Sequence, residues 1–355
     1  MMSPTCSRFF SRAFVSAGVL GALGAAAALV PQWRADRSAV SPTLRTTATW
    51  VPFTNVPGAV AMTIAGLGRR AVMAQPTGDD VQASRLRVQS PEGVSCDVHV
   101  LVPDSVDAAA DAPDWGDIPV MVWTHGGGHL VGAPEMYDTR NAAIARALGA
   151  IIVAPYYPKA PANPFPADFD VCYAALRWAQ ERTSGPLAVC GDSAGGGLAA
   201  GLAQRAFDGG HPVVFNGLVY PMLDHRTGQL PVEGGRGHFV WTANFNRAAW
   251  AAYLGADHLE RKLEPYASPV DRGDLTGMPP TWISIGTLDL FYDESRAYAD
   301  KLRAAGVPVD FVEVPGAYHG FDALAPKSPE TAQLTANLIA ALRPYLRPES
   351  VEENT

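Results

Sequence analysis

A run of small residues near the middle of the chain constrains the fold most. Gly191-Asp192-Ser193-Ala194-Gly195-Gly196 follows an apolar stretch and precedes further small residues. A serine with a glycine two residues away on each side can occupy a very tight turn from a strand into a helix. Glycine suits the flanks because a Cβ there would collide with the neighbouring strand and helix. The motif therefore predicts that Ser193 ends a strand and exposes its hydroxyl above a sheet.

A second glycine-rich motif, His125-Gly126-Gly127-Gly128, follows an apolar run at residues 118–123 that is typical of a buried strand. Three successive glycines leave backbone N–H groups that can approach a ligand closely. Such donors stabilise the oxyanion that forms when a serine attacks an ester carbonyl. A flexible glycine turn without chemistry is the alternative, and the serine turn further along the chain makes it less favoured. We interpret His125 as a support that hydrogen-bonds this loop, with Gly126 and Asp192 as further supporting positions.

Strands and helices alternate along the chain from about residue 85. This order indicates a mostly parallel sheet that is covered by helices on both faces. The expected strands cover residues 95–102, 120–123, 150–154, 187–190, 213–220, 281–285 and 309–314. The expected helices cover residues 137–148, 169–180 (with Asp168 as its cap), 198–207, 294–305 and 332–346.

Two segments interrupt the alternation. Residues 43–80 form an apolar stretch that contains aromatic side chains, and residues 222–280 are too long for a simple loop. We expect these segments to form a lid over a pocket, with ordinary packing at the sheet edge as the alternative. The longer segment carries five large aromatic residues: Phe239, Trp241, Phe245, Trp250 and Tyr253.

A serine nucleophile needs a general base, and the base needs an acid to orient it. Parallel sheets place such groups at the carboxyl ends of strands, here in the order serine, acid, histidine. Asp289 follows the expected strand at 281–285, while Asp293 occupies a helix-capping position and is the less favoured acid. His319 follows the strand at 309–314 and is the candidate base. The remaining histidines lie in an early strand, in loops or in the expected lid: His99, His211, His225, His238 and His258.

Composition excludes several classes of protein. The net charge of −8 and the absence of a basic run exclude a nucleic-acid-binding surface. The cysteines Cys6, Cys96, Cys172 and Cys190 show no metal-binding spacing, and no metal or cofactor is expected. Removal of Cys6 with a signal peptide would leave an odd number, which excludes a full disulfide framework. We expect Cys190 to pack as a small hydrophobic residue.

The N-terminus has the features of an export signal. Arg8 and Arg12 precede residues 13–30, which carry no charge, and Ala25, Ala26 and Ala27 offer small residues for cleavage. An uncleaved membrane anchor formed by residues 13–30 is the alternative. A buried helix is less favoured because a polar, proline-containing stretch follows. We therefore expect export to the periplasm, the cell envelope or the medium.

The expected organisation has four parts. Residues 1–40 form the signal peptide or anchor, residues 41–84 an N-terminal cap segment, and residues 85–348 the catalytic domain, with 222–280 as a cap-like insertion. Residues 349–355 form an acidic tail.

The motifs resemble those of the hormone-sensitive-lipase family of α/β-hydrolases, also called the GDXG lipolytic family, over roughly residues 85–345. Besides the two glycine motifs, the resemblance rests on Pro164-Phe165-Pro166-Ala167, Tyr266-Ala267-Ser268-Pro269, Asp289-Leu290-Phe291-Tyr292-Asp293-Glu294 and His319-Gly320-Phe321. It implies an α/β-hydrolase fold: a mostly parallel eight-stranded sheet with helices on both faces and a helical cap. It also implies that Ser193 is the nucleophile, Asp289 the acid and His319 the base. The oxyanion donors would be the N–H groups of Gly127, Gly128 and Ala194.

The chain departs from the family pattern at three places. His129 replaces the usual aromatic residue after the triple glycine, at a position expected to face the entrance of the acyl pocket. Leu290 replaces the proline that usually follows the acid. Tyr156-Tyr157-Pro158 replaces a frequent Asp-Tyr-Arg stretch, so we expect different contacts beneath the proline-rich loop.

The expected activity is hydrolysis of short- to medium-chain acyl esters by a serine carboxylic-ester hydrolase through an acyl-enzyme. The aromatic lid and the lack of a basic substrate clamp favour these chain lengths. An amidase or formamidase on the same residues is an alternative, as is a ligand-binding relative without turnover. The expected partner is a small acyl ester. The sequence leaves open membrane association through the N-terminal apolar segment and assembly into a homo-oligomer.

Overall fold

The computed structural model describes residues 34–50, 74–230, 232 and 234–348. Residues 1–33 of the expected signal peptide or anchor at 1–40, with Cys6, lie outside these residues, as do the acidic tail and residues 51–73 of the N-terminal cap segment. Among the described residues, no helix combines the length and the hydropathy needed to cross a bilayer.

The centre of the molecule is an eight-stranded sheet with the order β1-β2-β4-β3-β5-β6-β7-β8. Only β2 pairs antiparallel to its neighbours β1 and β4, and all other pairs are parallel. The predicted α/β-hydrolase fold and its mostly parallel eight-stranded sheet are confirmed. The strands are β1 Val81–Gln89, β2 Ser95–Pro103, β3 Val120–Thr124, β4 Ile151–Pro155, β5 Leu187–Asp192, β6 Phe215–Val219, β7 Thr281–Gly286 and β8 Val309–Val314.

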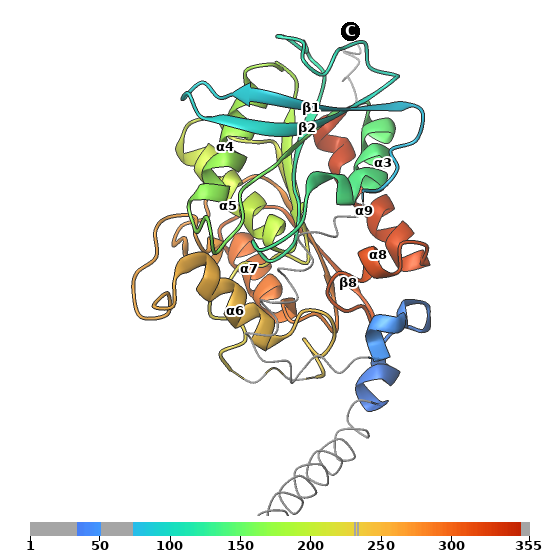
Figure 1. Ribbon diagram of the computed structural model, residues 1–355, viewed down its shortest axis with the longest axis vertical. Coiled ribbons are helices and arrows are strands. Elements are labelled where there is room, and N and C mark those ends of the chain that lie inside the picture. Colours follow the sequence, from blue (N-terminus) through green and yellow to red (C-terminus); the bar gives the residue numbers. More distant parts are fainter. Residues whose placement is uncertain (1–33, 51–73, 231, 233, 349–355) are drawn as a thin grey trace, which may run out of the picture.

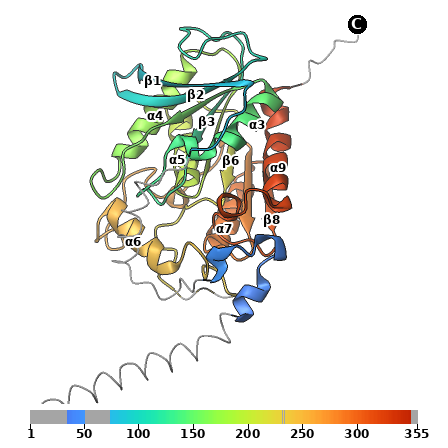
Figure 2. The same cartoon turned by 45° about the vertical axis from the view of Figure 1, so that its right-hand side comes forward.

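Helices cover both faces of this sheet. Figure 2 shows α3 (Asp138–Leu148) and α9 (Pro329–Leu346) on one side, with α4 (Ala167–Gln180) and α5 (Ala194–Asp208) on the other. The helix α7 (Tyr292–Ala304) packs on β7 and β8. Further helical elements are α6 Ala243–Leu254, α8 Phe321–Leu324 and the 3-10 turns η1 Pro42–Leu44, η2 Thr47–Trp50, η4 Pro134–Tyr137 and η5 Pro269–Asp271.

The sheet separates two hydrophobic cores because successive residues of a strand point to opposite faces. In β3, Met121 and Trp123 join the core beneath α3 and α9. Val120 and Val122 join the core beneath α4 and α5. Burial on both faces explains why the central strands appear in the sequence as continuous apolar runs.

The chain before β1 contacts the other end of the sequence. Leu44 is fully buried, and its carbonyl oxygen accepts a hydrogen bond from the Tyr318 hydroxyl at 3.0 Å. The backbone N–H of Ser41 donates to the Gly316 carbonyl at 3.0 Å, and its hydroxyl donates to Glu330 of α9 at 2.6 Å. This N-terminal segment therefore braces the loop that leads to His319.

The inserted segment lies where the parallel strands end. Its helix α6 occupies the end of the molecule away from β1 and β2 in both ribbon views (Figures 1 and 2). Four helices begin earlier than expected: α4 at Ala167, α5 at Ala194, α7 at Tyr292 and α9 at Pro329. Two expected caps were also wrong, because Pro166 is the N-cap of α4 and Phe291 is the N-cap of α7. Asp168 and Asp293 are therefore not caps, and both bind other partners.

Candidate active site

The tight turn between β5 and α5 places Ser193 at the carboxyl end of the central strand β5. Its backbone has φ 54° and ψ −124°, a conformation that non-glycine residues rarely adopt and that needs the surrounding structure to hold it. The Ser193 N–H donates to the Val219 carbonyl at 2.9 Å. A Cβ at Gly195 would lie 2.1 Å from the carbonyl oxygen of Thr124, so only glycine permits this approach of helix and strand.

Three side chains from distant parts of the chain meet at this turn. The hydroxyl of Ser193 lies 2.8 Å from Nε2 of His319, and Nδ1 of His319 lies 2.8 Å from the Asp289 carboxylate. The other carboxylate oxygen of Asp289 accepts the Phe291 N–H at 2.9 Å, and Asp289 is fully buried. Because the carboxylate accepts the proton of Nδ1, Nε2 is left to accept the serine proton.

The alternative acid, Asp293, lies elsewhere. Its carboxylate forms an ion pair with Arg236 at 2.6 Å and is largely exposed. The geometry therefore associates Asp289, and not Asp293, with the histidine.

The glycine loop after β3 presents backbone donors. Gly127 and Gly128 have φ values of 124° and 61°, in the region that favours glycine. The Gly127 carbonyl accepts the N–H groups of Leu130 and Val131, which closes the loop into a turn. Among the described residues, the N–H groups of Gly127 and Gly128 have no acceptor. Ala194 is the first residue of α5, where an N–H has no partner within the helix.

His125 supports this loop, as the sequence indicates. Its Nδ1 lies 2.7 Å from the Gly126 carbonyl, and Nε2 accepts from the Lys159 ammonium at 3.0 Å. Tyr157 stacks on the imidazole with ring centroids 4.2 Å apart and donates to the His125 carbonyl at 2.5 Å. Burial, reinforced by the Lys159 charge, holds the pKa of His125 well below its usual value, so the ring is neutral.

Asp192 connects the serine turn to the glycine loop. Its carboxylate accepts the Gly126 N–H at 3.0 Å and a hydrogen bond from Tyr137. Burial raises the pKa of Asp192 to about 7, and the nearby Arg140 charge opposes this shift.

A series of buried, hydrogen-bonded polar side chains packs against His319. The Tyr220 ring packs edge-on against the imidazole at 4.8 Å, and its hydroxyl donates to Asp322 at 2.6 Å. Arg140 donates to the other carboxylate oxygen of Asp322 at 2.8 Å. Sequence reasoning missed all three residues. Of the three, only Asp322 could have been noticed in the sequence, because it follows the candidate base His319 by three positions.

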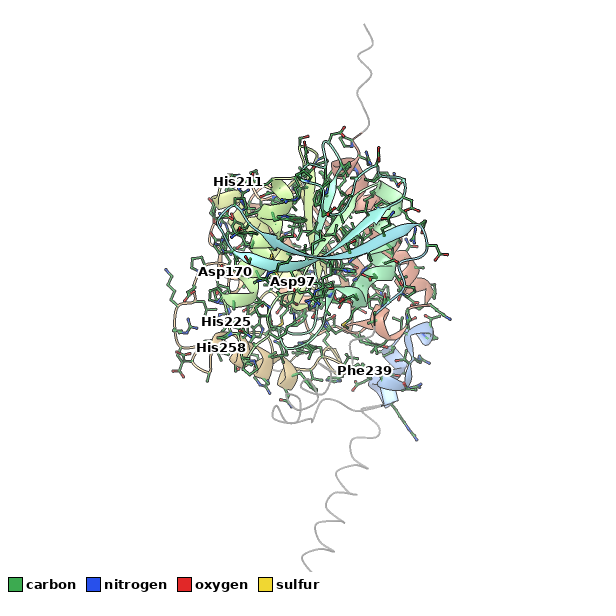
Figure 3. All side chains as sticks on the ribbon, turned by 45° about the horizontal axis from the view of Figure 1, so that its top comes forward. Asp97, Asp170, His211, His225, Phe239 and His258 are labelled. Carbon is green, nitrogen blue, oxygen red and sulfur yellow. The ribbon has the colours of Figure 1, made fainter. Side chains whose placement is uncertain are left out.

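Trp241 of the insertion covers the site. A Cβ on Gly128 would lie 2.3 Å from the Trp241 ring, and this ring lies 6.0 Å from the imidazole of His319. The indole N–H donates to Asn246 of α6 at 3.1 Å. Of the other expected lid aromatics, Phe245 lies beside Trp241, and Phe239 (labelled in Figure 3) packs on Tyr318.

The position after the triple glycine differs from expectation. His129 is only 2% exposed, so it does not face an entrance. Its ring stacks on Tyr253 and its Nδ1 donates to Asp168. The reason is that Asp168, which does not cap α4, supplies a buried acceptor next to this loop.

The other histidines lie apart from Ser193. His99 pairs with Asp138 at 2.9 Å, and His238 pairs with Asp36 at 2.7 Å. Figure 3 shows His225 beside His258, with ring centroids 5.5 Å apart, and His211 at a separate place. Within the described part of the chain, no group of three or more His, Cys, Asp or Glu residues is arranged to hold a metal.

The three described cysteines are free and buried. Burial raises the pKa of Cys96 to about 11 and that of Cys190 to about 12, so neither thiol ionises near neutral pH. Cys190 is fully buried in the core beneath α3 and α9, which confirms its packing as a small hydrophobic residue.

Comparison with known proteins identifies the class. Residues 121–323 match the model of the family described as alpha/beta hydrolase fold. The chain belongs to this family, in the hormone-sensitive-lipase type that the motifs indicate.

Two curated relatives come from Mycobacterium tuberculosis. Carboxylesterase NlhH is 34% identical over 235 residues, which cover 64% of this chain and 74% of NlhH. Esterase LipI is 34% identical over 243 residues, which cover 66% of this chain and 75% of LipI. The solved structure of a bacterial heroin esterase aligns with a TM-score of 0.74 and 31% identity, covering 87% of this chain and 99% of that one. Because these relatives are esterases, the chain is an esterase-type hydrolase that acts on ester bonds.

Proposed function

We propose that the protein is a serine carboxylic-ester hydrolase in which Ser193, His319 and Asp289 form the catalytic triad. The observation that carries this proposal is the continuous line of hydrogen bonds from Asp289 through His319 to Ser193, each of 2.8 Å. The N–H groups of Gly127 and Gly128, which have no acceptor among the described residues, also support it.

The geometry supports a two-step mechanism. The Ser193 oxygen attacks the ester carbonyl carbon while Nε2 of His319 takes its proton, and Asp289 stabilises the imidazolium. The N–H groups of Gly127, Gly128 and Ala194 bind the oxyanion. The tetrahedral intermediate collapses, His319 gives its proton to the leaving alcohol, and an acyl-Ser193 ester remains. Water, activated by His319, then releases the acid and restores the serine.

Replacement of the nucleophile tests the triad. Ser193→Ala should lower kcat on p-nitrophenyl butyrate by about 10⁶, because no other hydroxyl can form the acyl-enzyme. A fluorophosphonate probe should label the wild-type protein and leave Ser193→Ala unlabelled. Substantial activity in the variant would refute the assignment. A wild-type protein that neither turns over esters nor reacts with the probe would favour the ligand-binding alternative.

We propose short- to medium-chain acyl esters as substrates. Bulky aromatic side chains of the insertion surround the site, with Trp241 against Gly128 and Trp250 near His129. Rates on p-nitrophenyl esters from acetyl to palmitoyl should therefore peak at short or medium length, and a palmitate optimum would contradict this. Matched p-nitroanilides test the amidase alternative, which requires rates on the anilides equal to or above those on the esters.

We also propose that residues 1–40 contain an export signal, with a membrane anchor at residues 13–30 as the alternative. The charge pattern around Arg8 and Arg12 supports this proposal. N-terminal sequencing of the protein from an exporting host should find a start shortly after Ala25–Ala27. Full-length protein in the membrane fraction would support the anchor, and full-length protein in the cytosol would refute both.

A further inference from the structure

Three side chains outside the triad connect the cap to the glycine loop. His129 belongs to the loop after β3, Asp168 to the first turn of α4, and Tyr253 to the last turn of α6. We propose that these residues form a latch that holds the oxyanion donors in place only while α6 is docked, which makes His129 and Asp168 positioning residues. This inference rests on the proposed function.

The contacts within the latch are short and shielded from water. Nδ1 of His129 donates to one oxygen of Asp168 at 2.8 Å, and the Tyr253 hydroxyl donates to the other at 2.9 Å. The imidazole stacks on the Tyr253 ring at 3.6 Å with an angle of 9° between the planes. His129, Asp168 and Tyr253 are each at most 2% exposed. Loss of the His129 donor would leave Oδ2 of Asp168 as an uncompensated buried acceptor, which makes this bond costly to break. Loss of the Tyr253 donor is less costly because Oδ1 also accepts the Phe169 N–H at 2.7 Å.

The latch is joined covalently to the donors. His129 directly follows Gly128, and its backbone is left-handed, with φ 61°. Its carbonyl oxygen accepts the Ala160 N–H at 2.9 Å, so both the backbone and the side chain of this residue are fixed. A fixed residue at this position holds the Gly128–His129 peptide, and this limits the backbone rotation of Gly128, whose own N–H is one of the proposed oxyanion donors.

The cap completes the arrangement from the other side. Tyr253 and Trp250 of α6 both contact His129, and Trp241, which α6 holds through Asn246, lies over Gly128. Undocking of α6 therefore removes the stacked ring, one donor to Asp168 and the cover of Gly128 together. Displacement of a catalytic donor by about 1 Å costs on the order of 100-fold in rate, so this coupling is measurable.

Two substitutions at position 129 separate hydrogen bonding from ring packing. His129→Phe keeps a stacked ring and loses the bond to Asp168, whereas His129→Asn keeps a donor and suits the left-handed backbone. We expect His129→Phe to lower kcat by about 10- to 100-fold with KM changed less than about threefold. Its affinity for a trifluoromethyl ketone, whose serine adduct needs the oxyanion donors, should fall by the same factor. His129→Asn should keep most of the wild-type kcat and of the inhibitor affinity. Tyr253→Phe should lower kcat and inhibitor affinity less than His129→Phe does.

A matched control comes from the pair His99–Asp138, which is also buried and hydrogen-bonded at 2.9 Å. His99→Phe should lower the melting temperature about as much as His129→Phe and leave kcat and inhibitor affinity unchanged. The latch is refuted if His129→Phe and Tyr253→Phe keep wild-type kcat and inhibitor affinity, or if His129→Asn is as impaired as His129→Phe. Retention of activity by Ser193→Ala would instead refute the proposed function, so the two failures are distinguishable.

Discussion

At the scale of single residues, the site depends on polar groups that the protein holds away from water. Asp192 shows this clearly, because its carboxylate is buried between the serine turn and the glycine loop. Its pKa of about 7 in the folded protein lies far above the value of 3.8 for an exposed aspartate. The folded state therefore binds a proton that the unfolded chain releases.

This shift predicts a pH dependence of stability. The favourable contribution of protonated Asp192 is fully present below pH 3.8 and is lost as the pH rises through about 7. The stability of the wild-type protein should therefore fall as the pH rises from about 5 to about 7, and then level off, relative to that of Asp192→Asn, in which this site does not titrate. Urea unfolding midpoints at a series of pH values measure the difference.

Asp97 provides the control. It pairs with Arg85 and Arg87 on the surface, and these hydrogen bonds hold its pKa below the usual value. Its contribution is present above the unfolded pKa and is lost only in acid, so Asp97→Asn should not alter the slope between about pH 5 and pH 8. Equal slopes for wild type and Asp192→Asn would contradict the prediction.

Gly128 offers a second test at this scale. An alanine there would place its Cβ 2.3 Å from the Trp241 ring and would also have to adopt φ 61°. Gly128→Ala should lower kcat by about 100-fold because the loop or the indole must shift. Trp241→Ala in the same chain should recover part of this loss by removing the clash. If the double variant is no better than Gly128→Ala alone, the indole is not the obstacle.

Residues next to a motif could be predicted from the sequence, and residues that only the fold brings close could not. Ser193, Asp289 and His319 each follow a recognisable strand, so their convergence could be expected. Arg140 lies in α3 and Tyr220 directly after β6, and no local pattern relates either residue to His319. His129 was misjudged because its buried partner, Asp168, looked like an ordinary helix cap.

At the scale of elements, local patterns located most strands and helices but not their ends. The strand β1 was missed because it lies at the sheet edge, where several of its side chains are exposed and no apolar run marks it. It begins at Val81, so the expected domain boundary at residue 85 falls inside a strand. The helix α4 starts earlier than expected because Pro166, which needs no hydrogen-bonded N–H, serves as its cap.

The element that braces the His319 loop can be tested through its core residue. Leu44→Ala should lower the free energy of unfolding by about 2–4 kcal/mol, because Leu44 is fully buried and the chain there is tied down by hydrogen bonds. Chemical denaturation measures this change. Leu230→Ala, at a side chain that is 79% exposed, is the control and should change the free energy by less than about 0.5 kcal/mol. A similar small effect at position 44 would show that the segment is not docked.

At the scale of the whole molecule, strand and helix order was enough to predict the parallel sheet and its two covered faces. The antiparallel pairs of β2 could not be predicted, since a long edge hairpin and a parallel crossover give similar local patterns. The position of the cap was predictable only as an insertion between β6 and β7. Which of its aromatic residues reach the site depends on how α6 docks, and this is a property of tertiary packing.

The brace formed by residues 41–46 also limits how the protein can be processed. Ser41, Leu44 and Thr46 all bind the short stretch that runs from Gly316 to Tyr318, immediately before His319. A signal peptidase that cuts near Ala27 leaves this contact intact. A protease that trims the chain beyond residue 46 would loosen His319 without touching any side chain of the proposed triad, so ragged N-termini in a purified sample should lower its specific activity.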